Sequence, residues 1–313
     1  MSSKPRILVV GSINMDLVVR TPHMPAPGET VLGGGFVTSP GGKGANQAVA
    51  IARLGGDCRF IGRVGQDAFG QQLLAGMQAE HIDCTHVMPT PDASTGVAII
   101  VVDSHGENAI VVASGANHLV SPDDVFSAGS AFEQAQVVVL QLELPLPTVR
   151  AAIQLARRHG CKIILDPAPA QANLPTELCE VDVISPNVTE AELITGHRSV
   201  DETTDKLVAT ELIGRGAAAA VLKLGSRGSM VVTADGHFYT VWPYKVSVVD
   251  TTAAGDAFTG ALSVALGQGK HMRQAAQFAN AAGALACSSM GAQSAMPNLD
   301  QVNLLMRDQP MPG

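Results

Sequence analysis

The sequence predicts an α/β protein with a mainly parallel central sheet, helices on both of its faces, and a small additional β-sheet. Three observations lead to this prediction. Short apolar runs typical of buried strands alternate with helical patterns along most of the 313 residues. Polar residues recur where five of these strands end, which is where open α/β sheets bind ligands. Residues 17–40 are rich in proline, glycine and β-branched residues and lack helical periodicity.

The composition is typical of a soluble globular protein. Hydrophobic residues make up 46% of the chain and charged residues 15%, which argues against disorder. The net charge of −8, without a cluster of lysines and arginines, argues against nucleic acid or an anionic membrane as a partner. The apolar run at 7–10 is too short for a signal sequence or a membrane span. We therefore expect a cytoplasmic protein with its five cysteines reduced.

The first predicted strand, at 6–10, is followed by Asn14 and Asp16. These two side chains either contact a polar ligand or cap a turn. Residues 42–56 indicate a glycine turn that enters an alanine-rich helix and ends at glycine. The lysine of this turn is not a P-loop lysine. Gly44 stands where serine or threonine should follow it, and Val37 stands where the first glycine is needed.

A second small sheet is predicted after a strand at 57–64 and a helix at 69–81. The β-rich runs at 95–102 and 108–113 are joined by a turn and form a hairpin. With residues 17–40 they form a lid, about 15–40 and 95–118, on a single domain that spans 1–313. A sheet this small must pack on the main domain, on a ligand or on another chain. Its apolar positions either pack internally or form a homodimer face: Val18, Val31, Val97, Ile99 and Val101.

From residue 136 onward, strands and helices alternate regularly, which predicts right-handed crossovers in a mainly parallel sheet. The strands are expected at 137–142, 162–165, 181–184 and 218–224, and the helices at 147–159, 189–195 and 203–214. A β-rich stretch at 229–247 and a long helix at about 273–289 complete the pattern. Glu143, Asp166, Asn187 and Lys223 lie at the ends of the strands. Their recurrence indicates one shared crevice.

The segment 249–256 combines small residues with two carboxylates, Asp250 and Asp256, ahead of an apolar helical pattern. Small residues let the backbone approach a ligand closely. The helix that begins near Gly255 presents unpaired N–H groups and a partial positive charge, which suit an anion and phosphate above all. Asp256 is then placed to take a proton from a hydroxyl that attacks the phosphate. The alternative is an N-cap aspartate after a tight turn.

Nine ordered pieces of the sequence resemble motifs of the ribokinase (PfkB) family of carbohydrate kinases. They are Gly11-Ser-Ile-Asn-Met-Asp16, Gly41-Gly-Lys-Gly-Ala-Asn-Gln47, Ser94-Thr-Gly-Val-Ala98, Gln141-Leu-Glu143, Pro167-Ala-Pro-Ala170, Pro186-Asn187, Leu224-Gly-Ser-Arg-Gly228, Asp250-Thr-Thr-Ala-Ala-Gly-Asp256 and Gly291-Ala-Gln293. The two glycine-rich stretches resemble the two signatures of the family, and the lysine-containing one is typical of its ribose-specific members. The resemblance spans nearly the whole chain and implies a ribokinase-like three-layer α/β/α fold.

The resemblance implies ATP-dependent phosphorylation of D-ribose at O5, with Mg²⁺, to give D-ribose 5-phosphate and ADP. At matching positions, the sugar would be bound by Asn14, Asp16, Gly42, Lys43, Asn46 and Glu143, with Asp256 as the general base. The amides of Ala253, Ala254, Gly255 and Asp256 would form an anion hole. ATP would be bound by Asn187, Glu190, Lys223, Gly225, Ser226, Gly228, Gly255 and Asn280, and Asn187 with Glu190 would lie near Mg²⁺.

The resemblance also implies a K⁺ site beside the anion hole, and a homodimer formed through the lid. The positions that match the K⁺ site are Asp250, Thr252, Ala286, Ser289, Gly291 and Ala295. Two residues depart from the family pattern. Ala295 stands where serine is common, which removes a side-chain oxygen unless Ser294 compensates, and Asp166 stands where asparagine is frequent. The alternatives are a kinase for 2-deoxyribose or another sugar, and a sugar sensor without catalysis, which the presence of Asp256 opposes.

Overall fold

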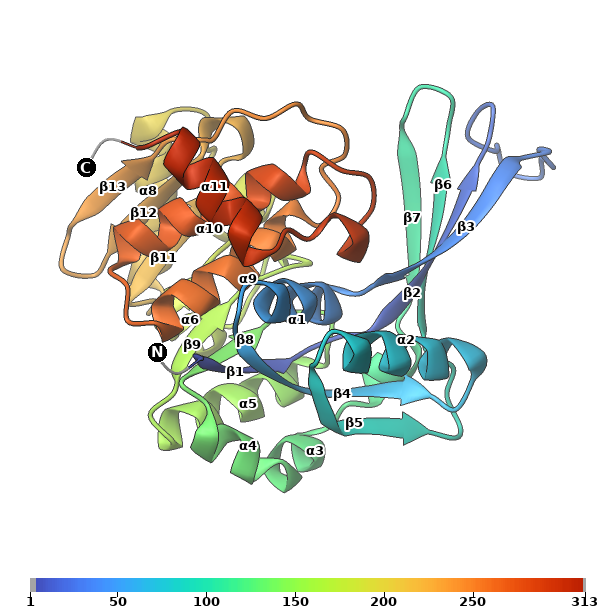
Figure 1. The fold of residues 1–313 in the computed structure, drawn as a ribbon, viewed down its shortest axis with the longest axis horizontal. Helices are drawn as coiled ribbons and strands as arrows, with labels where there is room; N and C mark the ends of the chain where they lie inside the picture. Colours follow the sequence, from blue (N-terminus) through green and yellow to red (C-terminus); the bar gives the residue numbers. More distant parts are fainter. Residues whose placement is uncertain (1–3, 312–313) are drawn as a thin grey trace.

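The computed structural model describes residues 4–311 and contains a nine-stranded sheet in the order β13-β12-β11-β10-β9-β8-β1-β4-β5 (Figure 1). The strands are β1 (Arg6–Val10), β4 (Asp57–Gly65), β5 (Asp83–Thr90), β8 (Val137–Leu140), β9 (Lys162–Leu165), β10 (Val183–Ile184), β11 (Ala219–Lys223), β12 (Ser229–Thr233) and β13 (Phe238–Val241). Neighbours from β11 to β5 are parallel, and β11, β12 and β13 pair antiparallel. The predicted, mainly parallel sheet is confirmed.

Helices cover both faces of this sheet because strand side chains alternate between them. In β1, Ile7 and Val9 belong to one core cluster and Leu8 and Val10 to the other. The first cluster is covered by α1 (Lys43–Arg53), α2 (Ala68–Ala79), α9 (Ala254–Gly267), α10 (Met272–Ala286) and α11 (Leu299–Asp308). The second is covered by α3 (Pro122–Ser127), α4 (Gly129–Gln134), α5 (Leu146–Arg158), α6 (Thr176–Cys179), α7 (Val188–Thr195) and α8 (Glu202–Gly214). Among the described residues, none of these helices is long and apolar enough to cross a membrane.

The small sheet projects from one end of the body, in the order β3-β2-β6-β7 (Figure 1). Its strands are β2 (Asn14–Arg20), β3 (Gly34–Gly41), β6 (Gly96–Val102) and β7 (Asn108–Ala113). The expected apolar positions do not share one face. Val18 pairs with Ile100, so it lies opposite Val97, Ile99 and Val101, and Val31 lies outside the strands. Residues 115–119 form a 3₁₀ helix instead of extending the sheet.

Several elements were not predicted. β5 is an edge strand with polar residues and Pro89, and such a sequence does not resemble a buried strand. The short helices α3 and α4 were also missed. The capping box of Asn298 and Gln301 is the signal that could have identified α11. The helix expected at 273–289 ends earlier, at Ala286.

The predicted crevice residues lie at one edge of the main sheet. The five strands that they follow, β11, β10, β9, β8 and β1, are consecutive neighbours and run parallel. Their carboxyl ends therefore meet at the same edge. β2 starts three residues beyond this edge, and α1 follows β3 directly. The small sheet and the main sheet thus both deliver side chains to this place.

Helix α9 packs closely on α1 because Gly260 has no side chain. A Cβ at this position would lie 2.7 Å from Ala50 Cβ and 3.0 Å from the carbonyl oxygen of Gln47. Both neighbours belong to α1. The two helices carry Asn46 and Asp256 in their first turns, so their separation also sets the distance between these side chains.

Gly260→Ala should lower the free energy of unfolding by about 1–3 kcal/mol, because the added methyl group overpacks the contact between the helices. Gly76→Ala is the matched control: it lies in α2 with open space around its Cα. It should raise the free energy of unfolding by about 0.5–1 kcal/mol. Urea unfolding of both variants measures the difference. Stabilisation by both substitutions would contradict the close contact.

Candidate active site

Asp256 is buried at the carboxyl edge of the sheet, in the first turn of α9. It is 5% exposed. The N-cap of α9 is Ala253, in a left-handed conformation with φ 57°, and no side chain caps the helix. Asp256 therefore does not serve as the N-cap, and the simpler structural explanation of this motif is wrong. The amides of the first turn lack intrahelical acceptors. That of Ala254 donates at 3.3 Å to the carbonyl of Thr251, which precedes the helix.

Two amide side chains of α1 orient the Asp256 carboxylate. Asn46 Nδ2 donates to Oδ2 at 2.9 Å, and Gln47 Nε2 donates to Oδ1 at 3.1 Å. Gln47 is held in turn, because its Oε1 accepts from Gln141 Nε2 at 2.6 Å. The Oδ1 of Asn46 is buried without a protein hydrogen-bond partner. Buried polar atoms are normally paired, so this acceptor is suited to a ligand hydroxyl.

Burial raises the pKa of Asp256, the nearby Lys43 opposes this shift, and Asp166 adds to it. Burial would depress the pKa of Lys43, but Asp256, Asp166, Glu143 and Glu190 together raise it. Lys43 is therefore a fixed positive charge among carboxylates. An aspartate with a raised pKa is a stronger base once ionised. The electrostatics thus suit proton abstraction at Asp256.

Glu143 and Asp16 are two further carboxylates among the predicted sugar positions. Glu143 Oε2 accepts hydrogen bonds from Ser12 Oγ and, at 3.1 Å, from the amide of Lys43. Burial, together with the negative charges of Glu143 and Asp256, raises the pKa of Asp16 to about 7. A Cβ on Gly41 would overlap the carboxylate of Asp16. The absence of a side chain at Gly41 therefore leaves the space that the Asp16 carboxylate occupies.

Asn14 is oriented by Asn117, a residue that the sequence analysis did not identify. Asn117 Nδ2 donates to Asn14 Oδ1 at 2.7 Å and to the carbonyl of Ile13 at 3.0 Å. Its Oδ1 accepts from the Ile13 amide at 2.9 Å. The amide group of Asn14 is thereby left to face the cavity beside it. This cavity of about 350 Å³ is lined by Asn14, Glu143, His118 and Gln171 among others, a size suited to a small ligand.

The nucleotide positions implied by the family lie around β10, β11 and α7. Asn187 and Glu190 form a capping box, in which each side chain accepts a hydrogen bond at 2.8 Å from the other's amide. The capping box does not use Glu190 Oε1 or the side-chain nitrogen of Asn187, Nδ2. Burial raises the pKa of Glu190, Lys223 lowers it and Asp166 raises it. A buried carboxylate with a raised pKa is suited to a nearby cation.

The loop at 225–228 connects β11 to β12 with glycine at two left-handed positions, φ 59° at Gly225 and φ 85° at Gly228. A Cβ on Gly228 would clash with the carbonyl of Val241. Asn280 Nδ2 donates to the carbonyls of Val241 and Trp242 at 3.0 and 3.1 Å. Asn280 thus supports the loop by fixing the segment beneath it. Ser226 is exposed at its tip.

Asp250 accepts hydrogen bonds from two of the other positions expected to bind a monovalent cation, Thr252 and Gly291. Asp250 Oδ1 accepts from the amide and hydroxyl of Thr252 at 2.9 and 2.6 Å, and Oδ2 accepts from the Gly291 amide at 2.8 Å. Ala286 ends α10, where carbonyls lack intrahelical donors. Ala295 is buried, and Ser289 is exposed on the connecting loop. Ser294 Oγ donates to the carbonyl of Met290 at 2.9 Å.

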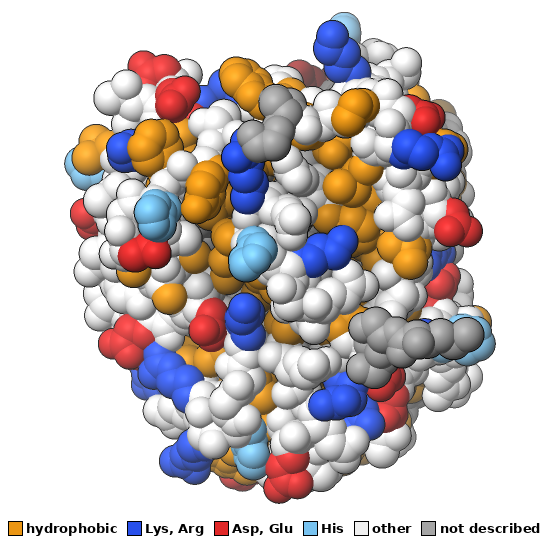
Figure 2. All heavy atoms as spheres, turned by 60° about the vertical axis from the view of Figure 1, so that its left-hand side comes forward, with side chains coloured by type: hydrophobic (Ala, Val, Ile, Leu, Met, Phe, Trp, Pro, Cys, Tyr) orange, Lys and Arg blue, Asp and Glu red, His pale blue; other side chains and the backbone are white. Residues whose placement is uncertain are grey.

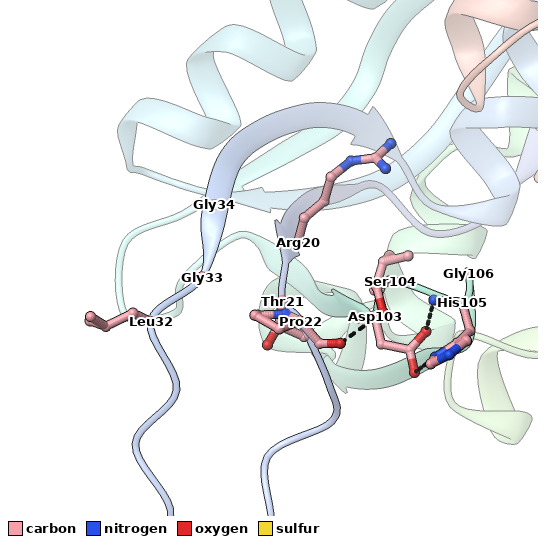
Figure 3. A pocket seen from close by; sticks show the side chains of 11 residues that line it. Arg20, Thr21, Pro22, Leu32, Gly33, Gly34, Asp103, Ser104, His105 and Gly106 are labelled. Carbon is pink, nitrogen blue, oxygen red and sulfur yellow. Dashed lines mark hydrogen bonds and ion pairs between the residues drawn. The ribbon is translucent and has the colours of Figure 1, made fainter.

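A larger cavity, of about 720 Å³, lies at the tip of the small sheet (Figure 3). Ser104 Oγ donates there to the carbonyl of Pro22, and Asp103 Oδ1 accepts from the His105 amide. These contacts stabilise the turn, and His105, which lies 3.7 Å from Asp103, has an exposed side chain. On the face turned forward in Figure 2, acidic and basic side chains are interspersed. We therefore assign the chemistry to the carboxyl edge of the sheet.

The chain is similar to known proteins along nearly its whole length. Residues 4–299 match the pfkB family carbohydrate kinases. A ribokinase from Haemophilus influenzae is 39% identical over 291 residues, which are 93% of this chain and 95% of the relative. A deoxyribokinase from Salmonella typhimurium is 35% identical and covers 95% of this chain and 97% of its own length.

A solved structure adds the fold. The structure of Arabidopsis thaliana ribokinase complexed with ribose and ATP superimposes with a TM-score of 0.90 at 31% identity. The match covers 97% of this chain and 99% of that one. With a family match along nearly the whole sequence and the same fold, the chain belongs to the pfkB family of carbohydrate kinases.

Proposed function

We propose that this sugar kinase transfers the γ-phosphoryl group of ATP to O5 of D-ribose, giving D-ribose 5-phosphate and ADP. The observation that carries the proposal is the position of Asp256. Its carboxylate is buried in the first turn of an uncapped helix and is oriented by Asn46 and Gln47. A base and an anion-binding helix end thus share one turn, which is what phosphoryl transfer to a hydroxyl requires.

In this proposal Asp256 accepts the proton of the sugar hydroxyl while the hydroxyl oxygen attacks the phosphorus. The amides of Ala253, Ala254, Gly255 and Asp256 stabilise the charge on the transferring group. The left-handed Ala253 supports this role, because that conformation costs about 1–2 kcal/mol for a residue with a Cβ. Such strain is concentrated at functional sites.

The sugar would be bound by Asn14, Asp16, Gly42, Lys43, Asn46 and Glu143. Four observations support this set. Asn46 Oδ1 is a buried acceptor without a protein partner. Asn117 orients Asn14. Glu143 accepts a hydrogen bond from the Lys43 amide and lies close enough to Asp16 to raise its pKa. Gly42 has φ 88° and sits against the backbone of Asn14, so only glycine fits there without strain.

The charges of the site support Mg²⁺ at Asn187 and Glu190. The carboxylates of Asp16, Glu143, Asp166, Glu190 and Asp256 outnumber the ammonium groups of Lys43 and Lys223. ATP adds further negative charge. Within residues 4–311 no three acidic, histidine or cysteine side chains are placed to hold a metal ion. This agrees with Mg²⁺ bound by one carboxylate and by phosphates, where it neutralises phosphate charge.

We propose that a K⁺ ion binds beside Asp250, which accepts hydrogen bonds from Thr252 and Gly291. Carbonyl oxygens at a helix end suit a hard cation, and α10 ends at Ala286 beside the loop of Asp250. Thr252, Ser289, Gly291 and Ala295 would contribute the remaining oxygens, with Ala295 supplying only its carbonyl. Hydrogen bonds from Thr252 and Gly291 lower the pKa of Asp250, although burial opposes the shift. Asp250 is therefore a permanent negative charge for the site.

We further propose that the small sheet is a lid on the 1–313 domain and also the dimer interface. Phe36 and Val111 are 65% and 66% exposed on its strands. Large apolar side chains that are exposed together on one surface are typical of interaction sites. The lid would exclude water, which competes with the sugar for the phosphoryl group. We place the enzyme in the cytoplasm, where its five free cysteines would stay reduced.

Phosphorylation of 2-deoxyribose is the alternative that a specific finding favours, since a deoxyribokinase covers nearly the whole chain at 35% identity. The experiment that decides is ADP release from Mg·ATP with D-ribose, 2-deoxyribose, fructose and adenosine, with and without potassium. We expect D-ribose to be preferred, because polar groups that face the 2-hydroxyl lose a partner in 2-deoxyribose. Potassium should stimulate turnover. Faster turnover of 2-deoxyribose would show that 2-deoxyribose, and not D-ribose, is the substrate. The absence of turnover with every sugar would favour a sugar sensor without catalysis.

Asp256→Asn should lower kcat with the preferred sugar by at least about 10²-fold, since the base is lost. Sugar binding, measured by calorimetry, should stay within a few-fold, because the amide keeps the shape of the carboxylate. Asp182→Asn is a control outside the site: its carboxylate accepts from the Ile163 amide. Near-normal turnover by Asp256→Asn would remove Asp256 as the base.

Asp16→Asn should stabilise the apoprotein above neutral pH. Between pH 4 and 7 the unfolded state loses the Asp16 proton while the folded state keeps it, so stability falls as pH rises. Above the pKa of Asp16 in the folded state, about 7, the loss in the free energy of unfolding is complete. Removing this carboxyl group should add about 1–3 kcal/mol at pH 8, after allowance for its contact with water. Urea unfolding at pH 5 and 8 provides the measurement.

Asp67→Asn is the control with the opposite sign. Burial opposes ionisation of Asp67, but hydrogen bonds from Thr95 and Gly70 give it a lowered pKa. Its stabilising contribution is therefore present at neutral pH and is lost as pH falls. Asp67→Asn should destabilise the protein at pH 8. An unchanged pH slope in Asp16→Asn would show that Asp16 does not carry the buried proton.

Val111→Glu should convert a homodimer into a monomer, because burying the new carboxylate in an apolar interface is unfavourable. The control is Leu207→Glu on α8, which lies away from the small sheet (Figure 1) and is 51% exposed. Sedimentation velocity measures both variants beside the wild type. A monomeric wild type, or a Val111→Glu variant that remains dimeric, would reject this interface.

A further inference from the structure

Asp166 is the most enclosed carboxylate of the site and faces donors on both sides. It follows β9 and is 1% exposed. Its Oδ1 accepts from Lys223 Nζ at 2.8 Å. Its Oδ2 accepts from Gln47 Nε2 at 2.9 Å and from Thr259 Oγ1 at 3.1 Å. From the sequence, Asp166 is a strand-end residue of the expected crevice, at a position where asparagine is frequent in the family.

The partners explain why a carboxylate stands here. Gln47 cannot turn its amide around, since its Oε1 accepts from Gln141 and its Nε2 also donates to Asp256. An asparagine at 166 has one acceptor oxygen and one N–H₂ group. It would therefore place donor hydrogens against either the Lys223 ammonium or the Gln47 amide. With a lysine at 223, position 166 requires two acceptor oxygens.

Lys223 extends from the end of β11 toward the first turn of α9. Its amide donates to the carbonyl of Pro186 at 2.9 Å, and its backbone pairs with Asn187 in a parallel bridge. A Cβ on Gly255 would lie 3.5 Å from Lys223 Nζ. The lysine is thus fixed at its base by the sheet and at its tip by Asp166, with the ammonium beside the uncapped end of α9.

We propose that Asp166 is a positioning residue that holds the Lys223 ammonium against the first turn of α9, where Lys223 contacts the phosphoryl group during transfer. The inference rests on the proposed kinase function. A lysine side chain is long and flexible, and fixing its charge in advance avoids reorganisation during the reaction. Asp166 also balances the buried charge before nucleotide binds, since an unpaired buried ammonium is unfavourable. Asp166 itself exchanges no proton with the substrate.

A double-mutant cycle on Asp166 and Lys223 tests this assignment. Lys223→Met should lower kcat by about 10²-fold, the effect of losing one donor to a developing charge, with KM for the sugar within threefold. Asp166→Asn should lower kcat by about tenfold, because Lys223 is no longer held in place. In the Lys223→Met background, Asp166→Asn should change kcat by less than about twofold, since Asp166 acts through Lys223. Thermal unfolding of all variants checks that they fold.

Two results would overturn the inference. If Asp166→Asn lowers kcat equally in both backgrounds, Asp166 acts on Asp256 through Gln47 and not through Lys223. If Lys223→Met leaves kcat within twofold of the wild type, the ammonium does not contact the transferring group. The split between kcat and the KM for the sugar separates both cases from a general loss of structure.

A binding measurement keeps the test independent of the sugar. Calorimetry compares ADP with a non-hydrolysable ATP analogue in the wild type and the two single variants. Lys223→Met should reduce the preference for the analogue by at least tenfold, and Asp166→Asn should reduce it in part. If the wild type phosphorylates no sugar of the panel, the proposed function fails. The binding measurement still shows whether Lys223 contacts the γ-phosphate and whether Asp166 supports this contact. An unchanged preference in Lys223→Met would refute the phosphate contact.

Discussion

The first turns of α1 and α9 meet at the carboxyl edge of the main sheet, where Asn46 and Gln47 of α1 donate hydrogen bonds to Asp256 of α9. The rest of the site depends on this contact. It requires close packing of the two helices, which Gly260 permits. It also leaves the end of α9 uncapped, so that an anion can occupy it. A carboxylate beside this helix end would repel a bound phosphate unless cations lay nearby, and in the proposed mechanism Lys43 and Lys223 supply that positive charge.

Buried polar groups are tolerated here because almost every one is paired. Gln141 donates to Gln47, Gln47 donates to Asp256 and Asp166, and Lys223 and Thr259 complete the shell of Asp166. Such a network fixes side-chain orientations more firmly than isolated bonds do. Two acceptors of this network, Asn46 Oδ1 and Gln141 Oε1, are buried without a protein partner. Open acceptors in an otherwise paired network are suited to ligand groups that donate hydrogen bonds.

Several side chains have both a structural and a proposed chemical role. Asn187 and Glu190 cap α7 with one oxygen each and retain free groups beside the nucleotide positions. Asp250 closes its own turn with Thr252 and reaches Gly291 across the loop. Asn280 supports the glycine loop from below through the carbonyls of Val241 and Trp242. In each case hydrogen bonds to neighbouring backbone groups fix the position of the side chain.

The sequence by itself determined the α/β class, the small second sheet and the edge at which the site lies. Alternating apolar runs and strand-end polar residues such as Asn14, Glu143 and Lys223 follow from local periodicity, which a single chain displays directly. It did not identify Asn117, or the roles of Gln47 and Asp166. Their side-chain partners are 57 to 209 residues away in the chain, and no spacing rule predicts such pairs.

Only the tertiary structure excluded the N-cap explanation of Asp256. As a sequence, an aspartate near a helix start fits an N-cap as well as a base. Only the approach of α1 shows that its oxygens face Asn46 and Gln47 instead of its own helix amides. The faces of the small sheet were decided in the same way. The register that pairs Val18 with Ile100 separates it from Ile99, because neighbouring residues of a strand point to opposite faces.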